Sequence, residues 1–184
     1  MKRIFIAVRI EPGEKLSGMI SSFKMALKND SIKWTEISNI HITLVFLGDT
    51  DENRVKEIDT LLAEVCNGFG DFELVLKGAG VFRSIKDPRI IWTGIANSKE
   101  IAELNKAISA RLRETGTNLE ERPFSPHLTL GRIKKISNTS VLTNIFEKYR
   151  EEEIQRIRVS KIILFESILR PEGPIYKAIG TYNL

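Results

Sequence analysis

Two histidines, His41 and His127, are the only ones in this chain of 184 residues, and a threonine follows each of them two residues later, Thr43 and Thr129. Histidine is the side chain whose ordinary pKa lets it gain or lose a proton near neutral pH, so a pair of histidines is a candidate for general acid/base catalysis. A single His-x-Thr in a strand is usually only a strand with one polar face. Two copies that use every histidine in the chain point to function instead.

Both copies have the pattern of a β-strand, His41-Ile42-Thr43-Leu44 and His127-Leu128-Thr129-Leu130. In a strand, residues i and i+2 share one face, so each histidine and its threonine are expected to look the same way. The apolar residues between them then look into a core. Each motif strand is therefore predicted to have a polar face that carries an imidazole and a hydroxyl.

The elements that must position these strands follow from the spacing of apolar residues and from breaking residues. Helices are predicted at about residues 14–28, 51–66, 98–114 and 139–149. Strands are predicted at about 4–8, 32–34, 39–47, 72–76, 89–92, 127–133, 154–165 and 175–179. Gly78 and Gly80 mark a turn or a bulge after the fourth strand.

The order of strands and helices repeats once along the chain. His127 lies 86 residues after His41, and the predicted strand at Arg89 begins 86 residues after Arg3. We therefore predict an α+β fold in which residues 1–184 form a single bilobal domain, with an internal repeat of about 1–86 and 87–184. Each of two pseudo-twofold-related lobes would hold a small, largely antiparallel sheet with outer helices. The two motif strands would then face each other across one active-site cleft.

Composition narrows the class of protein. A hydrophobic fraction of 42% and a charged fraction of 28% are typical of a globular chain and exclude a disordered one. No apolar run is long enough to span a bilayer or to form the core of a signal peptide, so a cytoplasmic protein with no membrane partner is expected. The single cysteine, Cys66, excludes a disulfide framework. The net charge of +4 suits a polyanionic partner.

Two imidazoles and two hydroxyls in one cleft, with no nucleophile beside a base, favour acid/base over covalent catalysis. One neutral imidazole can take a proton from water while the other gives a proton to a leaving oxygen. Thr43 and Thr129 can hold the non-bridging oxygens of a phosphate. The expected substrate is a phosphodiester, with no metal and no cofactor. Because the pseudo-twofold makes the two histidines nearly equivalent, their positions alone do not say which one is the acid.

The two tetrads and their flanks resemble the 2H phosphoesterase superfamily, in particular its RNA 2',3'-cyclic phosphodiesterase branch, also described as 2'-5' RNA ligase. The matching stretches are residues 3–8, 33–34, 41–48, 123–132, 166–169 and 173–176, which together extend over nearly the whole chain. This resemblance implies metal-independent hydrolysis of a terminal 2',3'-cyclic phosphate of RNA to a 2'-phosphomonoester. It also implies that His41 is the proton donor to the 3' oxygen and that His127 is the proton acceptor.

Five residues after each histidine the two copies differ, with Phe46 in the first and Arg132 in the second. Strict alternation along a strand would turn both side chains away from the cleft. Gly131 permits a bulge that would turn Arg132 inward, and the resemblance places an arginine near the phosphate, so Arg132 is expected to bind it. Phe46 has no glycine before it. It either stacks on a base, as the resemblance implies, or packs in the core.

Three functions are compatible with these residues. The first is hydrolysis, and the second is the reverse reaction, 2'-5' ligation, which the same acid/base pair would catalyse by microscopic reversibility. The third is a non-catalytic RNA or nucleotide binder, although a binder has no need of two titrating groups. The expected partner is an RNA with a 2',3'-cyclic phosphate end, a tRNA-derived end being one candidate. A monomer is expected, because a bilobal chain makes its cleft alone.

Overall fold

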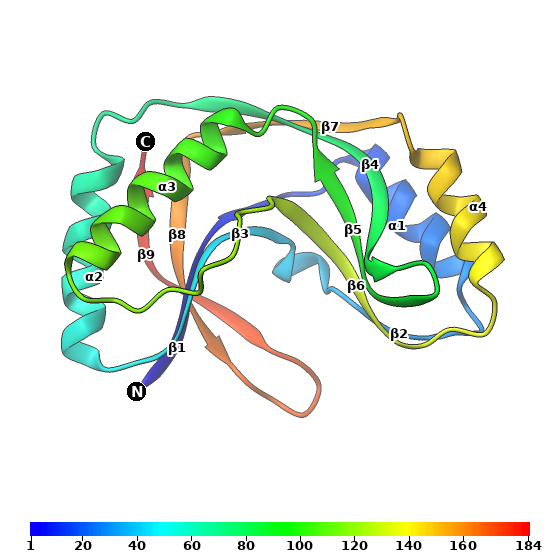
Figure 1. Cartoon of the computed structure of the whole chain (residues 1–184), viewed down its shortest axis with the longest axis horizontal. Helices are drawn as coiled ribbons and strands as arrows, with labels where there is room; N and C mark the ends of the chain where they lie inside the picture. Colours follow the sequence, from blue (N-terminus) through cyan, green and yellow to red (C-terminus); the bar gives the residue numbers. More distant parts are fainter.

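The computed structural model describes residues 1–184, and Figure 1 shows a curled antiparallel sheet with helices at both ends. The strands are β1 (Lys2–Arg9), β2 (Ser31–Trp34), β3 (His41–Thr50), β4 (Phe72–Ser84), β5 (Asp87–Ile95), β6 (His127–Lys135), β7 (Glu153–Val159), β8 (Lys161–Ile168) and β9 (Ile175–Asn183). The helices are α1 (Glu14–Ala26), α2 (Glu52–Cys66), α3 (Lys99–Glu114) and α4 (Thr139–Tyr149), and a 3-10 turn, Ile37–Asn39, precedes β3. No helix has both the length and the apolar character that crossing a membrane requires.

The sheet bends into two lobes that meet at the motif strands. Its strand order is β7-β4-β5-β6-β3-β1-β8-β9, and β2 pairs with the free side of β6. β3 and β6 are joined through one residue pair only, Ile42 with Leu128. One lobe therefore holds β9, β8, β1 and β3, and the other holds β7, β4, β5, β6 and β2 (Figure 1). The predicted α+β class with two antiparallel lobes is confirmed, and the two small sheets are continuous through that single pair.

Each lobe takes one helix from the opposite part of the sequence. α1 follows β1 along the chain but packs against β7 and α4 of the other lobe, and α3 follows β5 but packs against β3 and α2 (Figure 1). Equivalent elements begin at residues 2 and 87, 14 and 99, 41 and 127, and 52 and 139, which are offsets of 85, 85, 86 and 87. The order of elements thus repeats, whereas the lobes mix the two halves of the chain.

Apolar spacing of three and four residues explains the helices, because the buried side chains of α1 are Leu16, Met19, Ile20 and Phe23. These side chains belong to one cluster of 36 buried residues that extends through both lobes. A smaller cluster, made of Phe5, Ala7, Ile163 and Phe165, lies on the other face of β1 and β8, with Tyr176 packed against it. The central strands β1 and β8 are therefore packed on both faces, which gives the motif strand β3 a rigid neighbour.

The strand predicted at 154–165 is in fact two strands. β7 lies at the outer edge of one lobe beside β4, and β8 lies beside β1 in the other lobe, with Ser160 between them. No glycine or proline stands at this crossing, so the sequence offered no break to recognise. The predicted end of the first motif strand is also wrong, because β3 continues to Thr50. Gly48 adopts the left-handed φ of +72° and still pairs with Ile4 of β1.

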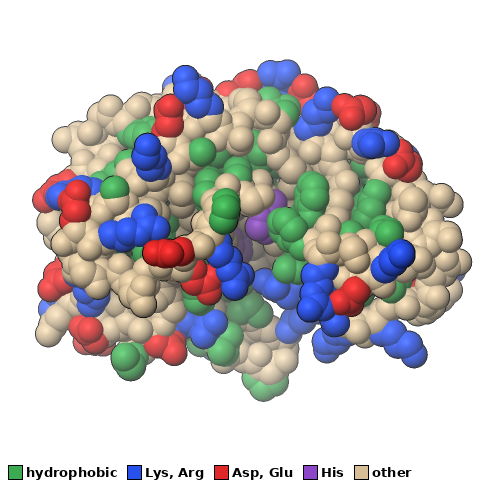
Figure 2. Space-filling model, viewed as in Figure 1, with side chains coloured by type: hydrophobic (Ala, Val, Ile, Leu, Met, Phe, Trp, Pro, Cys, Tyr) green, Lys and Arg blue, Asp and Glu red, His purple; other side chains and the backbone are tan.

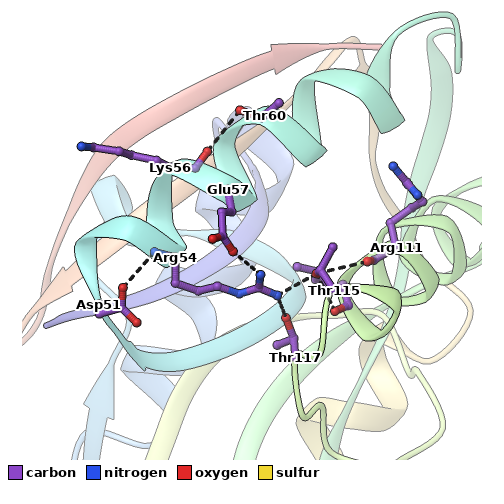
Figure 3. A network of polar contacts seen from close by, with 9 residues as sticks. Asp51, Arg54, Lys56, Glu57, Thr60, Arg111, Thr115 and Thr117 are labelled. Atoms are coloured by element: carbon purple, nitrogen blue, oxygen red, sulfur yellow. Dashed lines mark hydrogen bonds and ion pairs between the residues drawn. The ribbon is translucent and has the colours of Figure 1, made fainter.

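A polar network ties α2 to the end of α3 (Figure 3). Asp51 caps α2 by accepting a 2.9 Å hydrogen bond from the Arg54 backbone N–H. The Arg54 guanidinium donates to the hydroxyls of Thr115, at 2.6 Å, and Thr117, at 2.5 Å, and it pairs with Glu57. One arginine therefore connects the first turns of α2 to the residues that follow α3, which fixes how the two helices of this lobe pack.

Candidate active site

The two motif strands place both histidines in one cavity, as the internal repeat predicted. Their alternation is as expected, because Ile42 and Leu128 are fully buried while the His and Thr side chains are half-buried. The cavity has a volume of about 320 Å³. All six residues named from the sequence line it: His41, Thr43, Phe46, His127, Thr129 and Arg132. Figure 2 shows histidine atoms deep in the central hollow of the molecule, with Lys and Arg side chains near them.

Phe46 and Arg132 reach the cavity because each motif strand contains a bulge at the same position. The register of β3 against β1 shifts at Leu44, and the register of β6 against β5 shifts at Leu130. At each bulge two successive residues are buried, so the next side chain turns back to the polar face. The bulge that was predicted to turn Arg132 inward is confirmed, and a bulge of the same kind turns Phe46 inward although no glycine precedes it. Phe46 is 52% exposed, and the Arg3 guanidinium lies 4.9 Å from its ring centroid.

The bulge before Arg132 is present as predicted, but it does not depend on glycine. The bulge in β3 has Val45 at the equivalent position, so this kind of bulge does not require glycine. Gly131 is not among the glycines with a left-handed φ. What it provides is space, because a Cβ there would lie 2.9 Å from the Trp34 ring and 3.0 Å from Ile32 Cγ2 of β2. The absence of a side chain lets β2 pair closely with β6 beside Arg132.

His41 is held by a backbone carbonyl and by aromatic rings. Its Nδ1–H donates to the carbonyl oxygen of Asn39 at 2.6 Å, and the other ring nitrogen, Nε2, accepts a 3.1 Å hydrogen bond from the Thr43 hydroxyl. Phe5 and Tyr176 pack against the imidazole, with ring centroids 5.0 and 5.2 Å away. Burial lowers the pKa of His41 from its ordinary value; the hydrogen bond to the Asn39 carbonyl opposes that shift, and the charges of His127 and Arg132 add to it.

His127 is oriented by the same device. Its Nδ1–H donates to the carbonyl oxygen of Ser125, two residues earlier, at 2.8 Å. The Phe82 ring packs edge-on against the imidazole, with centroids 4.6 Å apart and an interplanar angle of 83°. In both histidines a backbone carbonyl therefore fixes the proton on Nδ1, and Nε2 points into the cavity, which is the arrangement that proton transfer with a ligand requires.

Eight further residues line the cavity and were not predicted to belong to the site, and four of them are polar: Arg3, Thr35, Ser167 and Tyr176. These four are the ones that can contact a polar ligand. Three of them fall in stretches that carried the family resemblance, but no spacing in the sequence linked them to the histidines. They come from β1, β8 and β9 and from the segment after β2, which reach the cleft only through long-range strand pairing. Burial raises the pKa of the Tyr176 phenol, and the nearby Arg132 charge works against that shift.

The cavity is cationic. Arg3 and Arg132 line it, and no aspartate or glutamate does. No three His, Cys, Asp or Glu side chains lie close enough together anywhere in the chain to hold a metal ion. Two arginines, two hydroxyls and two imidazoles around a space of this size suit a phosphate group with its negative charge and its several acceptor oxygens.

Comparisons with a family model and with known proteins all point to the same family. The model of the 2'-5' RNA ligase superfamily matches residues 28–167. A protein of Methanothermobacter thermautotrophicus named RNA 2',3'-cyclic phosphodiesterase is 32% identical over 99% of this chain and 98% of its own length. A protein of Methanocaldococcus jannaschii with the same name is 36% identical over 96% of this chain and 98% of its own length.

Solved structures have the same fold. TT0787 of Thermus thermophilus matches with a TM-score of 0.81 and 22% identity, over 99% of this chain and 97% of that one. LigT of E. coli complexed with 3'-AMP matches with a TM-score of 0.77 and 20% identity, over 100% of this chain and 98% of that one. The bilobal arrangement described above is therefore shared with experimental structures over its whole length.

Proposed function

The chain belongs to the 2'-5' RNA ligase superfamily of 2H phosphoesterases, and from that membership we propose that it hydrolyses terminal 2',3'-cyclic phosphates of RNA to 2'-phosphomonoesters. One observation carries the proposal. Two imidazoles, each fixed by a carbonyl two residues earlier, share one cationic cavity of about 320 Å³ with two threonine hydroxyls. A site that only bound a phosphate would gain nothing from two titrating groups held in this way.

In the proposed reaction, one imidazole takes a proton from water at Nε2 as the water oxygen attacks phosphorus. The bond from phosphorus to the 3' oxygen breaks, and the other imidazole, which is protonated, gives its proton to that oxygen. The products are a 2'-phosphomonoester and a free 3' hydroxyl. Thr43, Thr129 and Arg132 hold the non-bridging oxygens, on which negative charge increases in the transition state.

We assign the donor role to His41 and the acceptor role to His127. Burial lowers the pKa of His41 in the free protein, which by itself disfavours the protonated form that a donor needs. A bound cyclic phosphate brings a negative charge beside the ring, and an opposite charge favours the protonated imidazole. His41 would then become a competent acid only when substrate is present.

A change of leaving atom tests this assignment. In a substrate with sulfur in place of the bridging 3' oxygen, the leaving group is a thiolate, which needs little protonation. We expect His41→Ala to lose far less activity on the sulfur substrate than on the oxygen one, and His127→Ala to be equally impaired on both. The reverse pattern would exchange the two roles, and equal impairment of both variants on both substrates would refute any division of labour.

The proposed function itself is tested with chelator-treated protein and a short RNA that ends in a 2',3'-cyclic phosphate. The expected product carries its phosphate on the 2' oxygen, as resolved by mass and by chromatography against 2' and 3' standards. An added RNA with a 5' hydroxyl shows whether a 2'-5' linkage also forms. Absence of turnover from about pH 5 to 9 with binding intact would favour a non-catalytic binder.

We propose a monomer as the active unit, since one chain supplies both histidines. We also propose Phe46 as a stacking surface for the base of the nucleotide whose ribose carries the cyclic phosphate. RNA ends derived from tRNA in the cytoplasm are the first natural substrates to try. Phe46→Leu is expected to raise KM more than it lowers kcat, because stacking acts on bound substrate before and during the reaction.

A further inference from the structure

Two cavities with at least twice the volume of the catalytic cavity share lining residues with it. The first has a volume of about 690 Å³, shares Thr43, Phe46, His127 and Arg132 with the catalytic cavity, and continues along α3 and the segment 119–125. The second has a volume of about 740 Å³, shares Pro174 and Tyr176, and is bordered by residues 9–12, 36–39 and 172–176. A polynucleotide whose end sits between the histidines could leave through either one.

The two cavities differ in charge. The first, which we name the arginine groove, is lined by Arg113 and Arg122 in addition to Arg132, with Glu120 as its one acidic residue. The second is lined by three glutamates and a single arginine, Arg9, whose guanidinium lies over the Phe165 ring. An RNA backbone carries one negative charge for each nucleotide, so the arginine groove attracts it and the second cavity repels it.

The arginines of the groove are available for a ligand. Arg113 makes no ion pair within the chain, whereas Arg111, two residues earlier on α3, is paired with Glu64 and Glu114. Arg122 contacts Glu120 at 3.4 Å, but both side chains are mostly exposed, and such a pair is weak enough to exchange for a phosphate. The groove therefore has one unpaired cation, Arg113, and a second, Arg122, whose weak pair a phosphate can replace.

Aromatic rings also follow the arginine groove. Phe46, Phe82 and Phe124 line it, and Phe82 is the ring that packs against His127, so the groove begins at that histidine. A positive groove with aromatic side chains is the arrangement by which proteins bind single-stranded nucleic acid, because every base has a face that can stack. The groove has about twice the volume of the catalytic cavity, which leaves room for nucleotides beyond the terminal one.

We propose that the single-stranded RNA preceding the cyclic phosphate lies in the arginine groove, with its phosphates near Arg113 and Arg122 and a base against Phe124. This inference rests on the proposed function and adds the direction of the strand and the groups that recognise it. It follows that an oligonucleotide is a better substrate than a cyclic mononucleotide.

The experiment compares kcat/KM for a 2',3'-cyclic mononucleotide with that for a trinucleotide ending in the same cyclic nucleotide. The ratio of the two values isolates the groove, and the mononucleotide rate reports whether each variant has an intact catalytic cavity. We expect Arg113→Gln and Arg122→Gln each to lower the ratio by about three- to tenfold, and Phe124→Leu by at least about fivefold. Each arginine variant should also flatten the plot of log KM against log salt by about 0.7 for the trinucleotide.

Two matched controls accompany these variants. Arg111→Gln removes the same charge from the other side of α3, and Glu36→Gln removes a charge from the second cavity. Both are expected to leave the ratio unchanged. A rise in the ratio for Glu36→Gln with no effect of Arg113→Gln or Arg122→Gln would place the strand in the second cavity and overturn the proposal.

A wild-type protein that hydrolyses the mononucleotide and the trinucleotide equally well would also overturn it, while leaving the proposed function intact. If neither is hydrolysed, the proposed function fails, and fluorescence anisotropy of a labelled trinucleotide decides the placement separately. Weaker binding by Arg113→Gln than by Arg111→Gln would then support the arginine groove, and equal binding would refute it.

Discussion

Substituting Gly131 tests the reason given for the glycine beside Arg132. A methyl group at this position would lie 2.9 Å from a ring carbon of Trp34, which is closer than real Cβ contacts come, and 3.0 Å from Ile32 Cγ2, which is tighter than nine in ten of them. Either β2 moves away from β6 or the Trp34 ring leaves its place. Gly131→Ala is therefore expected to behave as an overpacked site, although its backbone is one that alanine can adopt.

Overpacking of this kind costs about 1–3 kcal/mol of unfolding free energy. For a chain of this length each kcal/mol lowers Tm by about 2–4 °C, so the expected loss is about 2–12 °C. Arg132 pairs with Lys33 across β2 and β6, and it follows Gly131 directly, so a displaced β2 also displaces the guanidinium. With Arg132 in its proposed role at the phosphate, a displaced guanidinium should lower kcat/KM by about tenfold.

The assay is a double-mutant cycle of thermal melts with Gly131→Ala and Trp34→Leu. Trp34→Leu removes the ring that the new methyl would meet. The loss of unfolding free energy in the double variant should therefore be smaller than the sum of the two single losses by about 0.5–3 kcal/mol. Simple additivity, or a Gly131→Ala protein that melts with the wild type, would refute the role of space. A backbone requirement for glycine, by contrast, would persist when the ring is gone.

The buried groups give three further predictions. Burial disfavours the charged form of His41 and lowers its pKa in the folded protein, so the contribution of neutral His41 to stability is complete above the ordinary histidine pKa of 6.5 and is lost as pH falls through the lowered folded-state pKa. In urea unfolding from pH 7.5 to 5, the wild type should therefore lose stability relative to His41→Gln. Parallel curves of stability against pH for the two proteins would contradict this. Arg54→Ala removes two hydrogen bonds of a side chain that is only 21% exposed, so it should lower the free energy of unfolding by about 1–3 kcal/mol in chemical denaturation. The control, Arg150→Ala, removes an exposed ion pair and should leave the denaturation midpoint unchanged. Cys66 is only 1% exposed, and burial raises the pKa of its thiol to about 11. A thiol reagent at pH 8 should therefore label Cys66 only in denaturant. Rapid labelling of the native protein would contradict this, because it would show that the thiol is accessible.

The residues of the site could be predicted from the sequence as far as local periodicity reaches. The shared face of His41 and Thr43 follows from the two-residue repeat of a strand, and the common cleft follows from the repeated order of elements. The direction of Phe46 could not be predicted, because it depends on a bulge at Leu44 whose position is set by how β3 pairs with β1. A bulge changes the face of every later residue in a strand, and periodicity alone does not register it.

The same limit explains the residues that were missed. Arg3 and Tyr176 lie more than 170 residues apart in the chain and reach the cleft from β1 and β9, which β8 separates. No spacing or periodicity near either residue indicates that it lies close to the histidines. The arginine groove is also a product of tertiary structure, since α3 comes to lie on β3 only because the two lobes exchange helices.

The exchange of α1 and α3 has a consequence for how the protein is made. The lobe that contains β1 is completed by β8 and β9. β1 pairs with β3 early in the chain, but its second partner, β8, lies more than 150 residues further on. The other lobe needs α1 from the beginning of the chain and β7 from near its end. Neither lobe can finish folding before these late strands have been synthesised, and contacts so distant in sequence form slowly. Catalytic activity would therefore appear as the last event of folding, and its recovery after dilution from denaturant would time the closure of the whole molecule.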